Sequence, residues 1–335
     1  MHKVFTPDWA DLELKQRTRR VTECLHCFLP NDFCEAVVQV VKIAKYYQTN
    51  KVEAYTFPLI FLPEYVELYG QNHFTESMHA LEDITPLISA EFAIRPFIVR
   101  YPQKTLAQIK KWAKHENHHV RRLASEGCRP RLPWAMALPK FIEDPTPILP
   151  VLEALKKDNS EYVRKSVANN LNDISKDHPD IVLQIVKRWK GLSAETDWIL
   201  KHASRTLLKR GEANALALHG FDPNVKSAVS QLSLENKNIK IGESTTFNFS
   251  VTNRQRKEVK LRIEYAITYL TSTSKSSRKV FQVSETSFAS GQQIQFKRKQ
   301  RFTDFTTRKH FPGKHKLEII VNGKIKSSLL FTLMR

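Results

Sequence analysis

Apolar residues recur with helical spacing over the first two thirds of the chain, up to about Gly220. Ile109, Trp112 and Ala113 follow i, i+3, i+4 spacing, which places them on one face of a helix. A similar apolar set continues across a helix–turn–helix step at residues 152–163. This pattern predicts an all-helical region built from short amphipathic helices.

The helical region also contains an internal repeat. The segment His119–Ser125 resembles Tyr162–Ala168, 43 residues later, and Trp198–Ser204 is a weaker copy. Repeats of about 40–47 residues are typical of HEAT-type helical pairs, which must stack to bury their apolar faces. The repeat therefore predicts a HEAT-like solenoid, whose second helices would place polar residues on one concave surface. The candidates for that surface are Arg121, Arg122, Arg164, Lys165, Lys201 and Arg205.

After Asn224 the apolar period changes from helical to two. Phe247–Val251 and Val259–Tyr265 alternate apolar and polar residues, as half-buried strands do. Further strand-like runs are Ala228–Leu234, Lys279–Val283, Ile294–Phe302, Lys316–Val321 and Ser327–Leu333. About seven short strands in about 110 residues indicate an Ig-like sandwich. The paired Cys and core Trp of antibody domains are absent from this part of the sequence.

These patterns predict two domains of different class: an all-α HEAT-like helical solenoid at residues 1–224, and an all-β Ig-like sandwich at residues 225–335. The net charge of +19 is unevenly divided between them. Residues 226–335 contain 22 Lys and Arg against 7 Asp and Glu, a balance of +15, and the rest of the chain has a balance of +4. A basic module beside a nearly neutral one is typical of proteins that bind nucleic acid or anionic membranes.

Several other classes are excluded by what the sequence lacks. No apolar run approaches the roughly 20 residues of a membrane helix, and the first residues lack the apolar stretch of a signal peptide. The cytoplasm is therefore the expected compartment, and the four Cys fit it without a disulfide framework. Glycine-rich phosphate loops and a GxSxG elbow are also missing, which argues against a nucleotide-driven motor and an acyl-transfer hydrolase. The HExxH motif of zinc proteases is missing as well.

A metal site is not predicted. Cys24, Cys27 and Cys34 lie close in sequence, but structural zinc usually needs four ligands in two separated pairs. On a helix, Cys24 and Cys27 are simply i, i+3 neighbours. We therefore expect neither a metal nor another cofactor.

Four residues near helix ends suggest chemistry. Glu91 and Glu126 each follow a Ser and precede an Arg-Pro pair, Trp134 closes the second of these blocks, and Asp173 ends the run Asn-Asn-Leu-Asn-Asp. Each Glu could instead form a local ion pair with an Arg, worth about 0–1 kcal/mol if exposed. A local ion pair would account for one such block. It accounts less well for two similar blocks that are followed by the polar run Asn-Asn-Leu-Asn-Asp.

At these residues the chain resembles the HEAT-like DNA alkylation-repair glycosylases of the AlkC type. The resemblance is strongest from Phe92 to Gly211 and includes Arg-Arg-Leu-Ala-Ser-Glu-Gly, Arg-Pro-Arg-Leu-Pro-Trp and Ser-Val-Ala-Asn-Asn-Leu-Asn-Asp-Ile. The Ig-like domain also resembles the AlkC type and separates the chain from the single-domain AlkD type. The resemblance extends over nearly the whole chain, with less signal before about Ile60.

The resemblance implies excision of 3-methyladenine and 3-methylcytosine from double-stranded DNA without deep base flipping. It assigns the catalytic positions to Glu91, Glu126, Trp134 and Asp173. It also implies a monomeric bacterial protein that associates with the nucleoid through DNA. The expected DNA-binding residues are Arg121, Arg122, Arg129, Arg131, Arg164, Lys165, Lys201 and Arg205.

This chemistry is physically reasonable. An alkylated base is cationic and a good leaving group, and its departure leaves an oxocarbenium-like sugar that a carboxylate stabilises. We expect Asp173 to serve this purpose with help from Glu126, Glu91 to complete the anionic cluster, and Trp134 to offer a π face worth about 0.5–2 kcal/mol. The alternative is a non-catalytic HEAT-like scaffold that binds DNA or protein, and the two differ in whether the carboxylates converge near Trp134. A carbohydrate-binding or adhesion role for the sandwich is a weaker alternative.

Overall fold

The chain folds into a helical unit followed by a strand-rich unit, as the sequence predicts. The computed structural model describes residues 3–50, 56–273, 275–305 and 309–335. Its two compact units are Met1–Ala203 and Ser204–Arg335. The sequence-based boundary between residues 224 and 225 marks the change of secondary structure, whereas the compact units divide earlier, at Ser204. No helix in the described ranges is long and apolar enough to cross a membrane.

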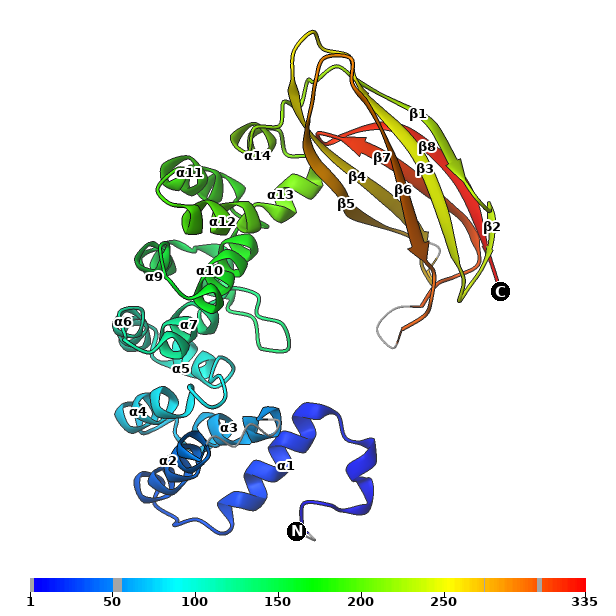
Figure 1. Cartoon of the computed structure of the whole chain (residues 1–335). Coiled ribbons are helices and arrows are strands. Elements are labelled where there is room, and N and C mark those ends of the chain that lie inside the picture. The colour runs from blue at the N-terminus through cyan, green and yellow to red at the C-terminus, as the bar shows by residue number, and fades with distance from the viewer. Residues whose placement is uncertain (1–2, 51–55, 274, 306–308) are drawn as a thin grey trace. The chain divides into compact units, whose positions relative to one another are not determined.

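The first unit is a stack of short helices (Figure 1). Within the described part of this unit, three 3-10 turns accompany them: η1 (Pro7–Asp11), η2 (Phe57–Ile60) and η3 (Thr146–Ile148). The α-helices in the described residues of this unit are α1 (Leu14–His26), α2 (Phe33–Thr49), α3 (Phe61–Tyr69), α4 (Phe74–Ile84), α5 (Ile94–Arg100), α6 (Pro102–Trp112), α7 (His118–Gly127), α8 (Pro139–Glu143), α9 (Leu149–Leu155), α10 (Glu161–Ile174), α11 (Pro179–Trp189) and α12 (Ala194–Ala203).

The internal repeat corresponds to helices that lie side by side. Its copies lie on α7, α10 and α12, and α10 packs against both of the others. The apolar positions Val120 and Val163 of the first two copies are buried at 1% and 0% exposure. The repeated sequence therefore encodes a row of neighbouring helices in the stack.

The repeat also contains two arginines that the sequence suggested as DNA-binding residues, and the structure gives both the same local contacts. Arg121 donates from Nη1 to the carbonyls of His115 and Glu116, six and five residues before it. Arg164, 43 residues on, donates from Nη1 to the carbonyls six and five residues before it at Asp158 and Asn159. Each arginine thus holds the loop that precedes its own helix, so this repeated residue has a packing role.

The second unit begins with α13 (Arg205–Arg210) and α14 (Ala213–Leu218) and continues as a two-sheet sandwich. One sheet has the order β1-β3-β6 and the other β2-β8-β7-β4-β5 (Figure 1). The strands are β1 (Ser227–Leu234), β2 (Asn238–Lys240), β3 (Ser244–Asn253), β4 (Val259–Leu270), β5 (Ser276–Phe288), β6 (Gln293–Arg301), β7 (Gly313–Val321) and β8 (Lys324–Met334).

Seven of these strands match the predicted runs. The inward residues of both sheets form one apolar core, which includes Phe247, Phe249, Ile263 and Ile319. The strand that the sequence did not reveal is β2, which pairs in parallel with β8 over three residues. Three residues are too few to show a period of two, so the alternation could not identify it.

Two glycines join α13 and α14 to the sandwich. Gly211 ends α13 at φ 73°, and Gly323 lies in the β7–β8 turn at φ 78°. A Cβ on Gly323 would lie 2.8 Å from the Gly211 Cα, so only residues without a side chain allow these backbones to approach. The Asn322 amide also donates to the Asp222 carbonyl at 2.9 Å. These contacts explain why the compact unit begins before the first strand.

Candidate active site

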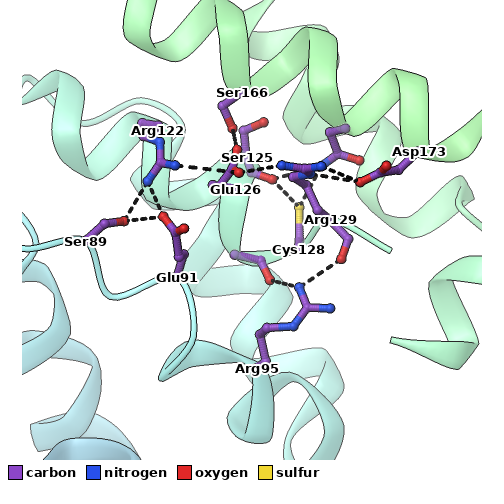
Figure 2. A network of polar contacts seen from close by, with 12 residues as sticks. Ser89, Glu91, Arg95, Arg122, Ser125, Glu126, Cys128, Arg129, Ser166 and Asp173 are labelled. Carbon is purple, nitrogen blue, oxygen red and sulfur yellow. Dashed lines mark hydrogen bonds and ion pairs between the residues drawn. The ribbon is translucent and has the colours of Figure 1, made fainter. Parts of the chain in front are cut away.

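Three carboxylates and two arginines alternate in one chain of ion pairs (Figure 2). Glu91 lies in the loop between α4 and α5, Glu126 in the last turn of α7 and Asp173 in the last turn of α10. Arg122 lies between the first two carboxylates, and Arg129 lies between the last two. The structure therefore brings together the three acidic residues that the sequence singled out.

The contacts are short and directional. Arg122 pairs with Glu91 through Nη1 and approaches the Glu126 carboxylate through Nη2 at 3.6 Å. Arg129 donates from Nη1 to Glu126 Oε1 at 2.6 Å. It also donates from Nε and Nη2 to Asp173 Oδ2 at 2.9 and 2.8 Å. Charged groups bound this directly hold each other in fixed orientations.

Hydroxyls and one lysine complete the network. Ser89 donates to Glu91 at 2.7 Å, and Ser166 donates to Glu126 at 2.6 Å. Lys176 donates to the second oxygen of Asp173 at 2.8 Å, from a side chain that is 35% exposed. The three carboxylates and two guanidiniums have a net charge of −1, which the Lys176 ammonium balances. Lys176 is thus the solvent-facing cation of the site.

Most of the network is buried. Glu126 and Asp173 are 4% and 2% exposed, and Arg129 is 7% exposed. Burial lowers the pKa of Arg122 and Arg129, but their neighbouring carboxylates outweigh it and raise the pKa of both above its usual value. Both guanidiniums therefore stay charged at any physiological pH.

Trp134 lies near these groups on a strained turn. The Ala135 N–H donates to the Leu132 carbonyl, which closes a turn with Pro133 in its second position and Trp134 in its third. Trp134 has φ 63°, where glycine is the usual residue, and its side chain is 72% exposed. A bulky residue in this conformation costs about 1–3 kcal/mol and is typical of functional sites.

A buried arginine holds the loop that contains this turn. Arg95 of α5 is fully buried and donates from Nη1 to the carbonyls of Gly127 and Arg129 at 3.0 and 2.8 Å. Its Nε donates to the Met136 carbonyl at 2.7 Å, beyond Trp134 (the guanidinium and two of its contacts are drawn in Figure 2). Both ends of the loop are therefore fastened to one side chain.

Glu91, Glu126 and Trp134 line the same cleft, which has a volume of about 370 Å³. Asp173 is joined to this cleft through Arg129 and does not line it directly. The remaining lining residues are Phe57, Ile60, Ile88, Ser89, Phe92, Arg122, Arg129, Leu132, Pro133 and Tyr162. The cleft thus combines apolar walls with the ion-pair chain.

The other cations suggested for DNA occupy varied environments. Arg131 pairs with Asp177, and Lys165 pairs with Glu161 at 2.8 Å on the exposed side of α10. Lys201 on α12 and Arg205 on α13 are both partly exposed. Arg122 and Arg129 bind carboxylates instead of facing solvent. Sequence reasoning identified the acidic residues but missed Lys176, Ser166 and Arg95, of which only Lys176 had a local signal, an i, i+3 spacing from Asp173.

A larger cleft of about 770 Å³ adjoins this one, and the lining residues that the two share are Phe57, Ile60, Ser89, Phe92 and Trp134. Glu67 of α3 lines the larger cleft. Burial, and secondarily the Glu64 carboxylate, raises the pKa of Glu67 from 4.5 to about 7. This side chain therefore binds a proton more tightly in the folded protein than in the unfolded chain.

Glu67→Gln is expected to stabilise the protein at pH 8 but not near pH 4.5. Between about pH 4.5 and 7 the folded state retains a proton that the unfolded chain loses, so wild-type stability falls as pH rises through this window. Glutamine removes that penalty, which is at most about 3–4 kcal/mol for the full shift. Urea unfolding at several pH values measures the difference, and exposed Glu23→Gln in the same cleft is the matched control. A gain for Glu67→Gln that is independent of pH would contradict this account.

Comparisons with known proteins agree with a helical region followed by an Ig-like region. The family described as "DNA alkylation repair enzyme" matches residues 2–207, and the family described as "Uncharacterised protein YhaZ, C-terminal Ig-like domain" matches residues 228–335. A relative from Bacillus subtilis (strain 168), "Uncharacterized protein YhaZ", is 45% identical over 97% of this chain and 88% of its own. A solved structure of Pseudomonas fluorescens alkylpurine DNA glycosylase AlkC, bound to DNA containing an abasic site analog, is 40% identical with a TM-score of 0.92. This match covers 98% of the present chain and 89% of the AlkC chain.

Proposed function

This chain belongs to the DNA alkylation repair enzyme family, and we propose that it is a DNA glycosylase that removes cationic N-alkylated bases, 3-methyladenine and 3-methylcytosine among them. The observation that supports this most is the chain of ion-paired carboxylates, two of which line one cleft with the exposed Trp134 while Asp173 is joined to them through Arg129. A packing role alone would not require a bulky indole on a strained turn near two buried acids and one partly buried acid.

In the proposed mechanism, the carboxylates stabilise positive charge on the sugar. Loss of a cationic base leaves an oxocarbenium-like sugar, and a fixed carboxylate lowers the energy of that state most in a water-poor site. Asp173 is assigned to this role because one of its oxygens accepts from two nitrogens of Arg129, whereas the other accepts from the partly exposed Lys176. Glu126 and Glu91 keep the surroundings negative, and water then attacks C1′ of the sugar.

Lys176 gives the site a means to respond to DNA. Its ammonium is the most exposed member of the network and balances the last negative charge. A DNA phosphate near this position would compete for the ammonium, because Lys pairs with phosphates as a mobile point charge. Removal of Lys176 from Asp173 would free a carboxylate oxygen for the sugar only when DNA is bound. Arg122 and Arg129 in this proposal hold carboxylates and not phosphates.

Trp134 is proposed to contact the damaged nucleotide without a deep base pocket. Its indole is 72% exposed, so it offers an open π face. Such a face favours a cationic base by about 0.5–2 kcal/mol over a neutral one. Selectivity would therefore come mainly from the positive charge and lability of the leaving base.

The direct test is release of free base from defined duplexes. Purified protein is incubated with DNA containing 3-methyladenine, 3-methylcytosine or uracil, and the released bases are separated and quantified. We expect release of the two alkylated bases and none of uracil, a neutral and poor leaving group. Efficient release of uracil would contradict the charge-based mechanism. Binding to DNA without release of any base would favour the non-catalytic scaffold.

The sandwich is proposed to bind the DNA backbone through its three-stranded sheet. Strands β1, β3 and β6, described in full, contain no Asp or Glu. Along β6 the residues on the exposed face include Lys297, Lys299 and Arg301, which pair across the sheet with Asn248, Thr246 and Ser244 of β3. A face with only cations and neutral polar groups suits phosphate contacts.

Replacing Lys297, Lys299 and Arg301 together with Gln is expected to weaken DNA binding and flatten its salt dependence. Each lost phosphate contact lowers the slope of log K against log salt concentration by about 0.9, or about 2.7 for three contacts. Fluorescence anisotropy at several salt concentrations measures the slope. The matched control replaces two exposed lysines of the other sheet (Lys240 and Lys314) and the exposed Lys237, which directly precedes β2, and it removes the same charge. Equal slopes for both triple variants would mean that only net charge matters.

A further inference from the structure

We propose that Cys34, His73 and Glu76 form a binding site for a zinc-class divalent cation, separate from the carboxylate network. One potential ligand atom from each residue lies within 4.8 Å of the other two. The site joins the start of α2 to the start of α4 within the helical unit. It is independent of the proposed glycosylase activity.

A close contact between two turns creates this juxtaposition. Gly70 ends α3, and a Cβ there would lie 2.3 Å from the Ser77 hydroxyl and 2.8 Å from the Phe33 ring. The missing side chain therefore lets the first residue of α2 pack on the α3–α4 turn. Cys34, the next residue, is thereby placed beside His73, the N-cap residue of α4. The His73 ring is further oriented by stacking on Phe33 at 5.1 Å.

The distances suit a tetrahedral metal. Zinc binds thiolate sulfur at about 2.3 Å and imidazole nitrogen at about 2.0–2.1 Å, so a tetrahedral angle separates the two ligand atoms by about 3.6 Å. Cys34 Sγ lies 3.5 Å from His73 Nδ1. The Glu76 carboxylate completes three ligands, one each of sulfur, nitrogen and oxygen, and leaves a position for water. Zinc accepts this mixed donor set, whereas magnesium and calcium prefer oxygen alone.

The local charge also favours a cation. The Asp32 and Glu76 carboxylates both act electrostatically on the Cys34 side chain. A divalent cation would be attracted by both carboxylates and would displace the thiol proton when it binds the sulfur. Binding should release about one proton, from the thiol to solvent.

Sequence spacing concealed this set of ligands. Cys24 and Cys27, the pair that looked like half of a metal motif, donate instead to the carbonyls of Lys3 and Glu23. The partners of Cys34 lie on another helix, 39 residues later in the chain for His73. A metal here would close that loop and stabilise the first helices of the solenoid.

Cobalt spectroscopy tests the site directly. Untagged protein is treated with a chelator, dialysed and titrated with Co²⁺ in the absence of oxygen. We expect a near-ultraviolet thiolate-to-cobalt charge-transfer band that saturates at one Co²⁺ per chain and disappears when Zn²⁺ is added. Calorimetric titration with Zn²⁺ in two buffers of different ionisation enthalpy should show the release of about one proton per metal bound.

Three variants separate this site from nonspecific binding. Cys34→Ser should abolish the band, and Cys27→Ser, at an exposed thiol, should leave it unchanged. Glu76→Gln changes an exposed residue with little risk to folding. Because Glu76 is proposed as a direct ligand, its loss should weaken Co²⁺ binding at least about tenfold, which is the smallest loss that even an outer-shell partner usually causes. The proposal is overturned if folded wild-type protein gives no charge-transfer band, or if the band survives Cys34→Ser.

Discussion

Asp173→Asn is expected to slow excision of 3-methyladenine at least about 100-fold, which corresponds to about 2.7 kcal/mol of activation free energy. Asparagine keeps an oxygen that can accept from Arg129, so most of the local geometry survives. It removes the negative charge that would face the oxocarbenium-like sugar. The expected defect is therefore in the chemical step and not in DNA binding.

Single-turnover excision on duplex DNA measures this effect, with DNA affinity and thermal unfolding followed in parallel. Asp177→Asn is the matched control, since Asp177 lies four residues later and pairs with Arg131 at the protein surface. It should change the rate less than about threefold, because surface substitutions usually change free energies by less than about 0.5 kcal/mol. A folded Asp173→Asn variant with near wild-type excision would falsify the assignment of this carboxylate.

Arg129→Met is expected to destabilise the helical unit by about 3–5 kcal/mol, the usual result of removing one partner from a buried ion pair. Arg129 is 7% exposed and lies between two nearly buried carboxylates, Glu126 and Asp173. Methionine has a similar length but no charge. The two acids would then face each other without the cation that holds them apart.

Tryptophan fluorescence during urea unfolding can isolate this effect, because all five tryptophans lie in the unit Met1–Ala203. Arg131→Met provides the control two residues away. Its pair with Asp177 is about one-third exposed on both sides, so its loss should cost only about 0–1 kcal/mol. Equal losses for the two variants would show that the buried network does not depend on Arg129.

Much of the fold could be predicted because its periodicities are local. Alternation identified the long strands, and the copies on α7, α10 and α12 identified the stacked helices. The attachment of α13 and α14 to the sandwich could not be predicted. It depends on Gly211 meeting Gly323, a contact between residues more than 100 positions apart that leaves no periodic signal.

In the candidate site, too, local features could be predicted and contacts between distant residues could not. The residue types and their places at helix ends could be identified, and the pairing of Glu126 with Arg122 and Arg129 follows from i, i+4 and i, i+3 spacing. The links from Arg122 to Glu91 and from Arg129 to Asp173 span neighbouring repeats. Whether those side chains meet depends on how far apart the neighbouring repeats stack, which the sequence does not show. The sequence therefore suggested Arg122 and Arg129 as DNA-facing cations, whereas in the structure both belong to one largely buried chain of ion pairs.

The fastening of the Trp134 loop by Arg95 has a consequence for the search along DNA. An indole held outward before any encounter requires no closing step, and such steps commonly take microseconds to milliseconds. A protein that slides along a duplex on phosphate contacts could therefore test each nucleotide as it passes. Lesion encounter would then be limited by residence time at each position, which ionic strength controls, and not by the opening or closing of a lid.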